Sequence, residues 1–439
     1  MPCVNVDKFA GDSGYQMNRL WINIYEEVQF SGGTQRTFEC FLNELDRFRI
    51  PYGLCFFSRK NGLFVDASTT HNNLFGSVSP SKRNAGSKYF EYIRRFLPHL
   101  PGTKTRSLPA AVFEPGDVIL NIIGLWSHSH DIYQKIKVIK SHLKMNYVCI
   151  AYDVTLSALP HLTWTSEFAD RSPPEIVTTD LFLAISKSTR SDLVRLLEKT
   201  NLPIPPIEII RLGDRAATGG ETTLRAPKLV PKSFILFVST VEPRKNHILL
   251  YQAWQQWLLE SATTVPFLVF AGAKGWHTDN FLRELTLNPM TAGKIIHVVP
   301  NEGELEWLYQ NCLFTIYPSL YEGWGLPVAE SLARGKYCLT TPVASIPEVG
   351  GDLVGYFSPF DPIECLSMVK RLWNDEKYLE ALEARIRREY REHTWTDCIR
   401  QIFGHLERHF SWRANFRGDS QWRVEHTRSN WQKNSVGHR

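Results

Sequence analysis

Residues 317–352 read YPSLYEGWGLPVAESLARGKYCLTTPVASIPEVGGD, and this stretch decides the fold. The apolar run 313–317 (LFTIY) at its start is short enough to be a buried strand. A loop punctuated by glycines follows at 322–325 (EGWG). Pro327 suits the first turn of a helix, because the N–H that proline lacks would have no helical partner there. We expect this helix to end at Gly335, a residue that readily adopts the left-handed conformation. The stretch therefore predicts a strand–loop–helix unit.

Two acidic residues lie on either side of the end of the loop and the start of the helix in this unit. Glu322 lies in the loop and Glu330 in the first turns of the helix. Between them, the N–H groups of residues 323–326 should point outward at the positive end of the helix dipole. The pattern predicts a cradle for an anion or for hydroxyl groups, and the alternative is a plain glycine turn with two solvated glutamates. The dinucleotide fingerprint G-x-G-x-x-G is excluded, because Val328 stands where its third glycine should be.

The motif E-G-x-G-L-P-x-x-E, with S-I-P-E at 345–348, resembles the donor site of the retaining glycosyltransferases of family four. These enzymes have the GT-B architecture. The resemblance implies that Glu330 holds the ribose hydroxyls of a nucleotide sugar and that Glu322 lies at the sugar ring. It also implies donor contacts from the loop between them, namely from Gly323, Trp324, Gly325 and Leu326.

A second motif lies upstream of the first. The apolar run 234–238 predicts a parallel strand covered on both faces. The turn after it carries Arg244 and Lys245, which are placed to bind a diphosphate. This turn resembles the family's E-P-R-K-N motif, whose lysine binds the donor pyrophosphate. Many members carry a further arginine near the position of Ser239 or Thr240, and its absence here leaves Lys245 as the principal candidate.

Two positions in the N-terminal half complete the candidate site. Gly33 belongs to a glycine turn before an expected helix at 37–45, and it resembles the family's first loop, near the donor phosphates. Asp153 ends an expected strand at 147–153, where a polar side chain points into the ligand crevice. Tyr152 stands where the family often has a histidine. The resemblance gives Glu322, Lys245 and Asp153 as the catalytic candidates.

The alternation of strands and helices predicts an α/β protein. The resemblance implies the GT-B fold, in which two Rossmann-like domains face each other across a cleft. We expect an N-terminal, acceptor-binding domain, a linker, a domain that binds the nucleotide-sugar donor, a helix that crosses back to the first domain and a basic, mobile tail. These segments span 1–214, 215–232, 233–391, 392–410 and 411–439.

Composition is that of a soluble globular protein with two or three domains. The chain has 439 residues, of which 43% are hydrophobic and 22% charged. No apolar run approaches the roughly 18 residues that span a membrane, and no signal peptide is apparent. The eight cysteines show no CxxC spacing, which favours reduced thiols in a cytoplasmic protein. Because no Asp-x-Asp triad is present either, we expect no metal and no cofactor.

The net charge of +5 is unevenly distributed. Residues 82–106 hold seven Lys/Arg and one Glu, and residues 411–439 hold six Lys/Arg and two Asp/Glu. Aromatic residues lie among the cations of an expected helix at 88–97, a pattern suited to an anionic membrane surface. A solvated helix is the alternative, and nucleic acid fits poorly because no reading motif is present. The prediction is peripheral association with the inner face of the plasma membrane.

The residues and the resemblance together predict a retaining hexosyltransferase. Its donor would be a nucleotide sugar, with GDP-mannose favoured over UDP-hexoses, because the resemblance is to mannosyltransferases of bacterial surface polysaccharide synthesis. The acceptor would be a glycan or a lipid-linked glycan. Two alternatives stay open. Tyr152 and the absent arginine are compatible with a non-catalytic homologue that acts as a scaffold or partner subunit, and a nucleotide-sugar epimerase would share the Rossmann architecture.

Overall fold

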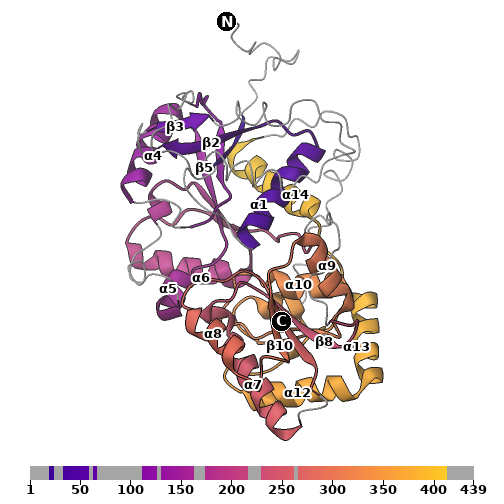
Figure 1. Cartoon of the computed structure of the whole chain (residues 1–439). Helices are drawn as coiled ribbons and strands as arrows, with labels where there is room; N and C mark the ends of the chain where they lie inside the picture. Colours follow the sequence, from indigo (N-terminus) through magenta and orange to yellow (C-terminus); the bar gives the residue numbers. More distant parts are fainter. Residues whose placement is uncertain are drawn as a thin grey trace, which may run out of the picture.

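The computed structural model describes residues 19–23, 33–58, 63–66, 111–125, 130–162, 174–215, 229–261 and 265–412. In these ranges the chain forms two parallel β-sheets with helices packed against them (Figure 1). The first sheet and its helices come from the N-terminal half and the second from the C-terminal half. The expected α/β class with two Rossmann-like domains is confirmed.

The N-terminal sheet has the strand order β3-β2-β1-β4-β5-β6-β7, with every pairing parallel except that of β2 with β3. Its central strands are buried on both faces, as the continuous apolar runs in the sequence predict. The strands are β1 (Leu20–Asn23), β2 (Tyr52–Ser58), β3 (Leu63–Asp66), β4 (Val118–Asn121), β5 (Asn146–Ala151), β6 (Leu181–Ala184) and β7 (Ile207–Ile209).

The C-terminal sheet has the order β10-β9-β8-β11-β12-β13, and all its pairings are parallel. Chain order reverses between β8 and β11, so the loops that follow these two strands diverge and leave room for a ligand at the carboxyl edge. The strands are β8 (Phe234–Val238), β9 (Phe267–Ala271), β10 (Ile295–Val298), β11 (Thr315–Tyr317), β12 (Cys338–Thr340) and β13 (Gly355–Tyr356).

Helices cover both sheets, and several begin at a residue whose side chain caps them. Ser186 accepts from the backbone N–H of Thr189, and Asn301 forms a capping box with Glu304. The α-helices are α1 (Gly33–Arg47), α4 (His130–Leu143), α5 (Thr155–Ala158), α6 (Lys187–Leu197), α7 (His247–Glu260), α8 (Asp279–Leu287), α9 (Glu302–Asn311), α10 (Leu326–Ala333), α11 (Ile346–Gly350), α12 (Pro362–Asn374), α13 (Glu376–Glu389) and α14 (Trp395–Phe410).

The last helix, α14, leaves the C-terminal domain and packs beside α1 of the N-terminal domain (Figure 1). The hydroxyl of Thr396 donates to Glu44 of α1 at 2.6 Å, and the backbone N–H of Arg211 donates to Gln401 at 2.7 Å. The crossing helix expected from the resemblance is therefore present. The expected boundaries of the other segments stay predictions.

Several expectations fall outside the described residues. The expected helix at 88–97, the basic segment 82–106, residues 216–228 of the linker and residues 413–439 of the tail are among them. Of the eight cysteines, seven are described, and all seven are buried free thiols, as expected. Among the described residues, no helix combines the length and the apolar character that crossing a membrane requires.

Candidate functional site

The two loops singled out in the sequence meet at the switch point of the C-terminal sheet. The loop after β8 continues into a short 3₁₀ turn, Pro243–Lys245, and the loop after β11 runs from Pro318 to Gly325. Asn246 joins them, because its side-chain amide donates to the carbonyl of Pro318 at 3.1 Å. This contact holds the basic turn against the glycine loop.

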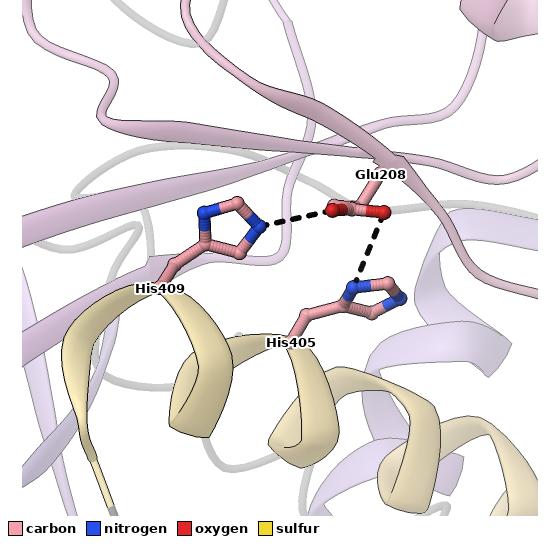
Figure 2. A group of neighbouring side chains, drawn as sticks. All are labelled: Glu208, His405 and His409. Carbon is pink, nitrogen blue, oxygen red and sulfur yellow. Dashed lines mark hydrogen bonds and ion pairs between the residues drawn. The ribbon is translucent and has the colours of Figure 1, made fainter.

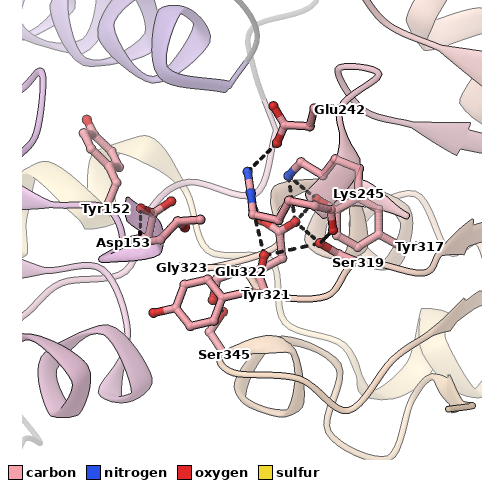
Figure 3. Close-up of polar contacts among 12 residues, drawn as sticks. Tyr152, Asp153, Glu242, Lys245, Tyr317, Ser319, Tyr321, Glu322, Gly323 and Ser345 are labelled. Carbon is pink, nitrogen blue, oxygen red and sulfur yellow. Dashed lines mark hydrogen bonds and ion pairs between the residues drawn. The ribbon is translucent and has the colours of Figure 1, made fainter. Parts of the chain in front are cut away.

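Glu322 is the centre of the site (Figure 3). One carboxylate oxygen accepts from the ammonium of Lys245 at 2.6 Å, from the hydroxyl of Ser319 at 2.6 Å and from that of Tyr317 at 2.8 Å. The other oxygen lies 3.1 Å from the guanidinium of Arg244. The Glu322 side chain is buried, and the side chains of both cationic partners are 12% exposed. The two predicted diphosphate-binding cations are thus fixed by the acid that was predicted to lie at the sugar.

The electrostatics of this group keep Glu322 ionised. Burial by itself raises its pKa, but Arg244, Lys245 and the Ser319 hydrogen bond outweigh burial and lower the pKa to about 2. Arg244 is held further by Glu242 at 2.8 Å and by the carbonyl of Tyr321 at 2.7 Å. The group is a buried, charge-compensated network in which no charge lacks a partner.

The predicted cradle is present at the start of α10. Gly325 caps the helix in the left-handed conformation, with φ of 95°, which a residue with a side chain adopts only under strain. In the part of the chain that the structure describes, the N–H groups of residues 323–326 have no protein acceptor. Four backbone donors at a helix N-terminus remain available to an anion.

Gly323 has a different role from the one expected. A Cβ atom at this position would lie 1.8 Å from the carbonyl oxygen of Tyr152 in the other domain. The absent side chain therefore permits close contact between the domains, whereas the sequence suggested close approach of a ligand. Thr189 adds to this contact, because its hydroxyl lies 3.2 Å from the carbonyl of Gly323 and 3.3 Å from that of Tyr152.

Asp153 lies at this same contact, beside Gly323 (Figure 3). Its carboxylate accepts from the backbone N–H of Thr155 at 3.0 Å, at the start of α5. The phenol of Tyr152 donates to the carbonyl of Ile122 at 2.7 Å, so it is committed within its own domain. Tyr152 therefore joins two strand ends of the N-terminal sheet, and its hydroxyl does not reach the cradle.

Glu330 is buried, and both its oxygens are engaged. The guanidinium of Arg36, on α1 of the N-terminal domain, lies 2.9 Å from one oxygen, and the phenol of Tyr309 donates to the other at 2.5 Å. Arg36 also lies 3.4 Å from Glu302. Gly33 opens the same helix three residues before Arg36.

Further contacts join the domains around the site. The carboxylate of Glu348, in the S-I-P-E motif, accepts from the backbone N–H groups of Lys187 and Ser188 at 2.8 and 2.7 Å. The glutamate thus binds the first N–H groups of α6 in the opposite domain. The phenol of Tyr321 donates to Asp192 of α6 at 2.7 Å. The loop after β11 consequently binds both domains.

The other two predicted donor contacts, Trp324 and Leu326, both pack against the hydrophobic core. Trp324 is buried in the core, with the guanidinium of Arg211 5.4 Å from the centre of its ring. Leu326 packs partly buried against the same core.

Sequence reasoning missed Arg36 and Tyr309, although the position of Arg36 in the first turn after Gly33 was a usable signal. Nothing local to Tyr309 indicated its bond to a residue 21 positions away.

This arrangement can bind an anion and stabilise negative charge. Lys245 and Arg244 supply fixed positive charge beside four unpaired backbone donors. A diphosphate group bound there would replace its hydrogen bonds to water with hydrogen bonds to protein groups that are already in position. A carboxylate such as Glu330 can accept from two neighbouring hydroxyl groups. The site therefore suits a ligand that carries a diphosphate next to a diol.

Residues 222–389, which include the whole of this site in the C-terminal domain, match the protein family described as glycosyl transferases group 1. The O-antigen chain mannosyltransferase B of Escherichia coli is 30% identical over 229 residues, or 50% of this chain and 58% of that protein. A serotype-specific mannosyltransferase, WbdA, of Escherichia coli is 24% identical over 237 residues, or 53% of this chain and 29% of that protein. The match thus spans between about three tenths and six tenths of these relatives.

The fold is shared with a solved structure over nearly its full length. Alr3699/HepE of Anabaena, crystallised in complex with UDP and glucose, superposes with a TM-score of 0.56. The superposition covers 89% of this chain and 99% of that one, at 10% sequence identity. With the two parallel sheets and the crossing helix, this similarity identifies the architecture as GT-B.

We expect Glu322→Gln to destabilise the protein in a way that depends on pH. Removing one partner of a buried ion pair typically costs about 3–5 kcal/mol. Because the folded-state pKa lies at about 2, below the ordinary 4.5, the stabilisation by Glu322 is complete above pH 4.5 and is lost as pH falls toward 2. Thermal unfolding at pH 7, 5, 4 and 3 should therefore show a Tm difference that is largest at pH 7 and narrows below about pH 4.5.

Glu380→Gln is the matched control, because Glu380 is an exposed glutamate on α13. It should leave Tm nearly unchanged at every pH. A Glu322→Gln variant as stable as this control at pH 7 would contradict the role of Glu322 as the buried anchor of the two cations.

Proposed function

We propose that this chain, whose residues 222–389 form a group 1 glycosyl transferase domain, is a retaining mannosyltransferase. It would move mannose from GDP-mannose to a glycan or lipid-linked glycan, with UDP-hexoses as the second choice of donor. Two Escherichia coli relatives that are named mannosyltransferases support the choice of sugar. The proposal covers the activity of the whole protein.

The observation that carries this proposal is the pairing of a diphosphate site with a diol site on adjacent loops. Lys245 and Arg244 lie beside the N–H groups of residues 323–326, and Glu330 follows on the same helix. A nucleoside diphosphate carries both a diphosphate group and a pair of neighbouring ribose hydroxyls on one molecule. A site that binds both groups therefore favours a nucleotide sugar over a simple phosphate ester.

In the proposed reaction, the bond between the anomeric carbon and the diphosphate oxygen would break, and the nucleoside diphosphate would leave with the bonding electrons. The oxygen of an acceptor hydroxyl would bond to the anomeric carbon on the same face, and its proton would pass to the departing diphosphate oxygen. Lys245 and the backbone N–H groups would stabilise the growing negative charge on that oxygen. Glu322 would act through Lys245, because its carboxylate fixes the ammonium at 2.6 Å. Asp153 enters the site from the opposite domain, beside Gly323, where the acceptor side of the reaction would lie.

Glu330 would bind the ribose while it keeps its protein partners. A carboxylate offers about four acceptor positions, and Arg36 and Tyr309 occupy two of them. The remaining two suffice for two neighbouring hydroxyl groups. Arg36 would then link the bound nucleotide to the N-terminal domain, because the guanidinium comes from α1.

The purified chain tests this proposal. We expect it to release nucleoside diphosphate from GDP-mannose faster than from UDP-glucose, and mass spectrometry of products formed with glycan acceptors should show an added hexose. We expect EDTA to leave the rate unchanged at 25 °C, because cationic side chains and oriented amides replace Mg²⁺ in the mechanism.

The alternatives give different results in the same experiment. A non-catalytic scaffold would release nothing from any donor, and an epimerase would show the absorbance of bound NAD and change the donor without transfer. Loss of activity in EDTA that Mg²⁺ or Mn²⁺ restores would refute the metal-independent mechanism.

The two glutamates should have separable effects. Glu330→Gln should weaken binding of the free nucleoside diphosphate by about 1.5–3 kcal/mol, the usual range for hydrogen bonds to a charged group. Because this contact is equal in the ground and transition states, it should raise the donor KM. Glu322→Gln should lower kcat while nucleotide affinity changes little, because Lys245 keeps its charge but loses its fixed position.

Calorimetry with the diphosphate alone, beside steady-state kinetics, measures both effects. The variants are compared below their unfolding temperatures, with Glu380→Gln as the control. If Glu322→Gln loses nucleotide binding and Glu330→Gln keeps it, the two roles are reversed.

Association with an anionic membrane surface also stays a prediction, based on the basic segments 82–106 and 411–439. Each cation near an anionic leaflet contributes about 1 kcal/mol, and salt screens this attraction. The chain should float with liposomes that contain anionic lipid and be released as salt rises. Flotation that is indifferent to lipid charge or to salt would indicate that these segments are solvated surface.

A further inference from the structure

Three possible metal ligands lie together where α14 meets the edge strand β7 (Figure 2). Nε2 of His409 is 3.0 Å from one carboxylate oxygen of Glu208, and Nδ1 of His405 is 3.5 Å from the other. The ligand atoms of the three residues all lie within 4.8 Å of one another. These residues belong to neither of the two loops that form the nucleotide site.

We propose that Glu208, His405 and His409 form a binding site for Zn²⁺ or a similar first-row divalent cation, which fastens the crossing helix to the N-terminal sheet. Zinc binds imidazole nitrogen and carboxylate oxygen at about 2.0–2.2 Å, so ligand atoms in a tetrahedral site lie roughly 3.3–3.5 Å apart. Two of the separations are already close to this value. Three protein ligands leave the fourth position to water.

Two of the three ligands lie near each other in the sequence, and the fold brings the third to them. His405 and His409 are four residues apart on one helix, so they lie on the same face, one turn from each other. Glu208 is 201 residues from His409 in the chain and comes from the last strand of the N-terminal sheet. Imidazole ligands exclude Mg²⁺ and Ca²⁺, which prefer all-oxygen sites.

The surroundings of His405 fix the tautomer that a metal needs. Nε2 of His405 lies 3.2 Å from the carbonyl of Ile209, an acceptor only, so this nitrogen carries the proton. The lone pair is therefore on Nδ1, which faces Glu208. A backbone carbonyl that orients the second ring nitrogen is the usual outer partner of a metal-bound histidine.

The guanidinium of Arg408 competes with a metal ion for one of the three ligand atoms. This group donates to Nδ1 of His405 at 2.7 Å, so metal binding has to displace it. Arg408 is a surface residue of α14 whose other contact is the carbonyl of Gly404 at 3.3 Å. This competition yields a distinctive test, because removal of a positive side chain that is not a ligand should strengthen metal binding.

The test is calorimetric titration of the metal-free full chain with ZnCl₂, in the absence of nucleotide. We expect the titration to show one zinc site. His409→Gln should weaken zinc binding there by more than roughly 10–100-fold, which is the usual cost of losing a residue that only hydrogen-bonds to a metal ligand. Arg408→Gln should strengthen binding by about tenfold, as expected for removal of an exposed positive charge about 6 Å from a divalent cation at a dielectric constant near that of water. His142→Gln, which removes an exposed histidine of α4, should leave the site unchanged.

Thermal unfolding provides a second readout. Zinc should raise Tm in the unchanged chain and in His142→Gln, and it should not do so in His409→Gln. Equal zinc affinity in His409→Gln and the unchanged chain would overturn the proposal, and so would weaker binding in Arg408→Gln. Because neither measurement involves donor or transfer, the outcome is independent of the proposed enzymatic activity. A zinc ion at this position is structural, so its removal by EDTA should lower Tm without stopping transfer at 25 °C.

Discussion

The site depends on the buried carboxylate of Glu322. Two cations, Lys245 and Arg244, and two hydroxyl groups surround it. A carboxylate taken out of water is stable only with such partners, and each cation needs the carboxylate for the same reason. The network therefore fixes the loop after β8 and the loop after β11 to one another. The positions of Lys245 and Arg244, the predicted diphosphate-binding residues, follow from this compensation of charge.

The same loops also determine how the two domains meet. Gly323 contacts the backbone of Tyr152, Arg36 reaches Glu330, and Glu348 binds the N-terminus of α6. In each case a residue of one domain completes a group in the other. A change in the candidate donor site should therefore also change the contacts between the two domains. Tyr152 illustrates this, because its phenol stabilises the N-terminal domain while its carbonyl lies against the donor loop.

Sequence reasoning succeeded where the physics is local. Continuous apolar runs identified the buried strands β8 and β11, and Pro327 and Gly335 indicated the two ends of α10. The motifs of two strand–loop–helix units predicted Lys245, Glu322 and Glu330 as ligand contacts, and the structure pairs Lys245 with Glu322. The strand at 20–23 was not anticipated, because four residues without a flanking turn signal carry too little periodicity.

Patterns within about ten consecutive residues predicted the α/β class and the two motifs that meet in the candidate site, and the resemblance carried by those motifs implied the two-domain organisation. Only the tertiary structure decided which groups pair. The bond of Arg36 to Glu330, the contact of Gly323 with Tyr152 and the meeting of Glu208 with His409 each join segments more than a hundred residues apart. Such pairs depend on how the two sheets and α14 pack, and no local pattern encodes that packing.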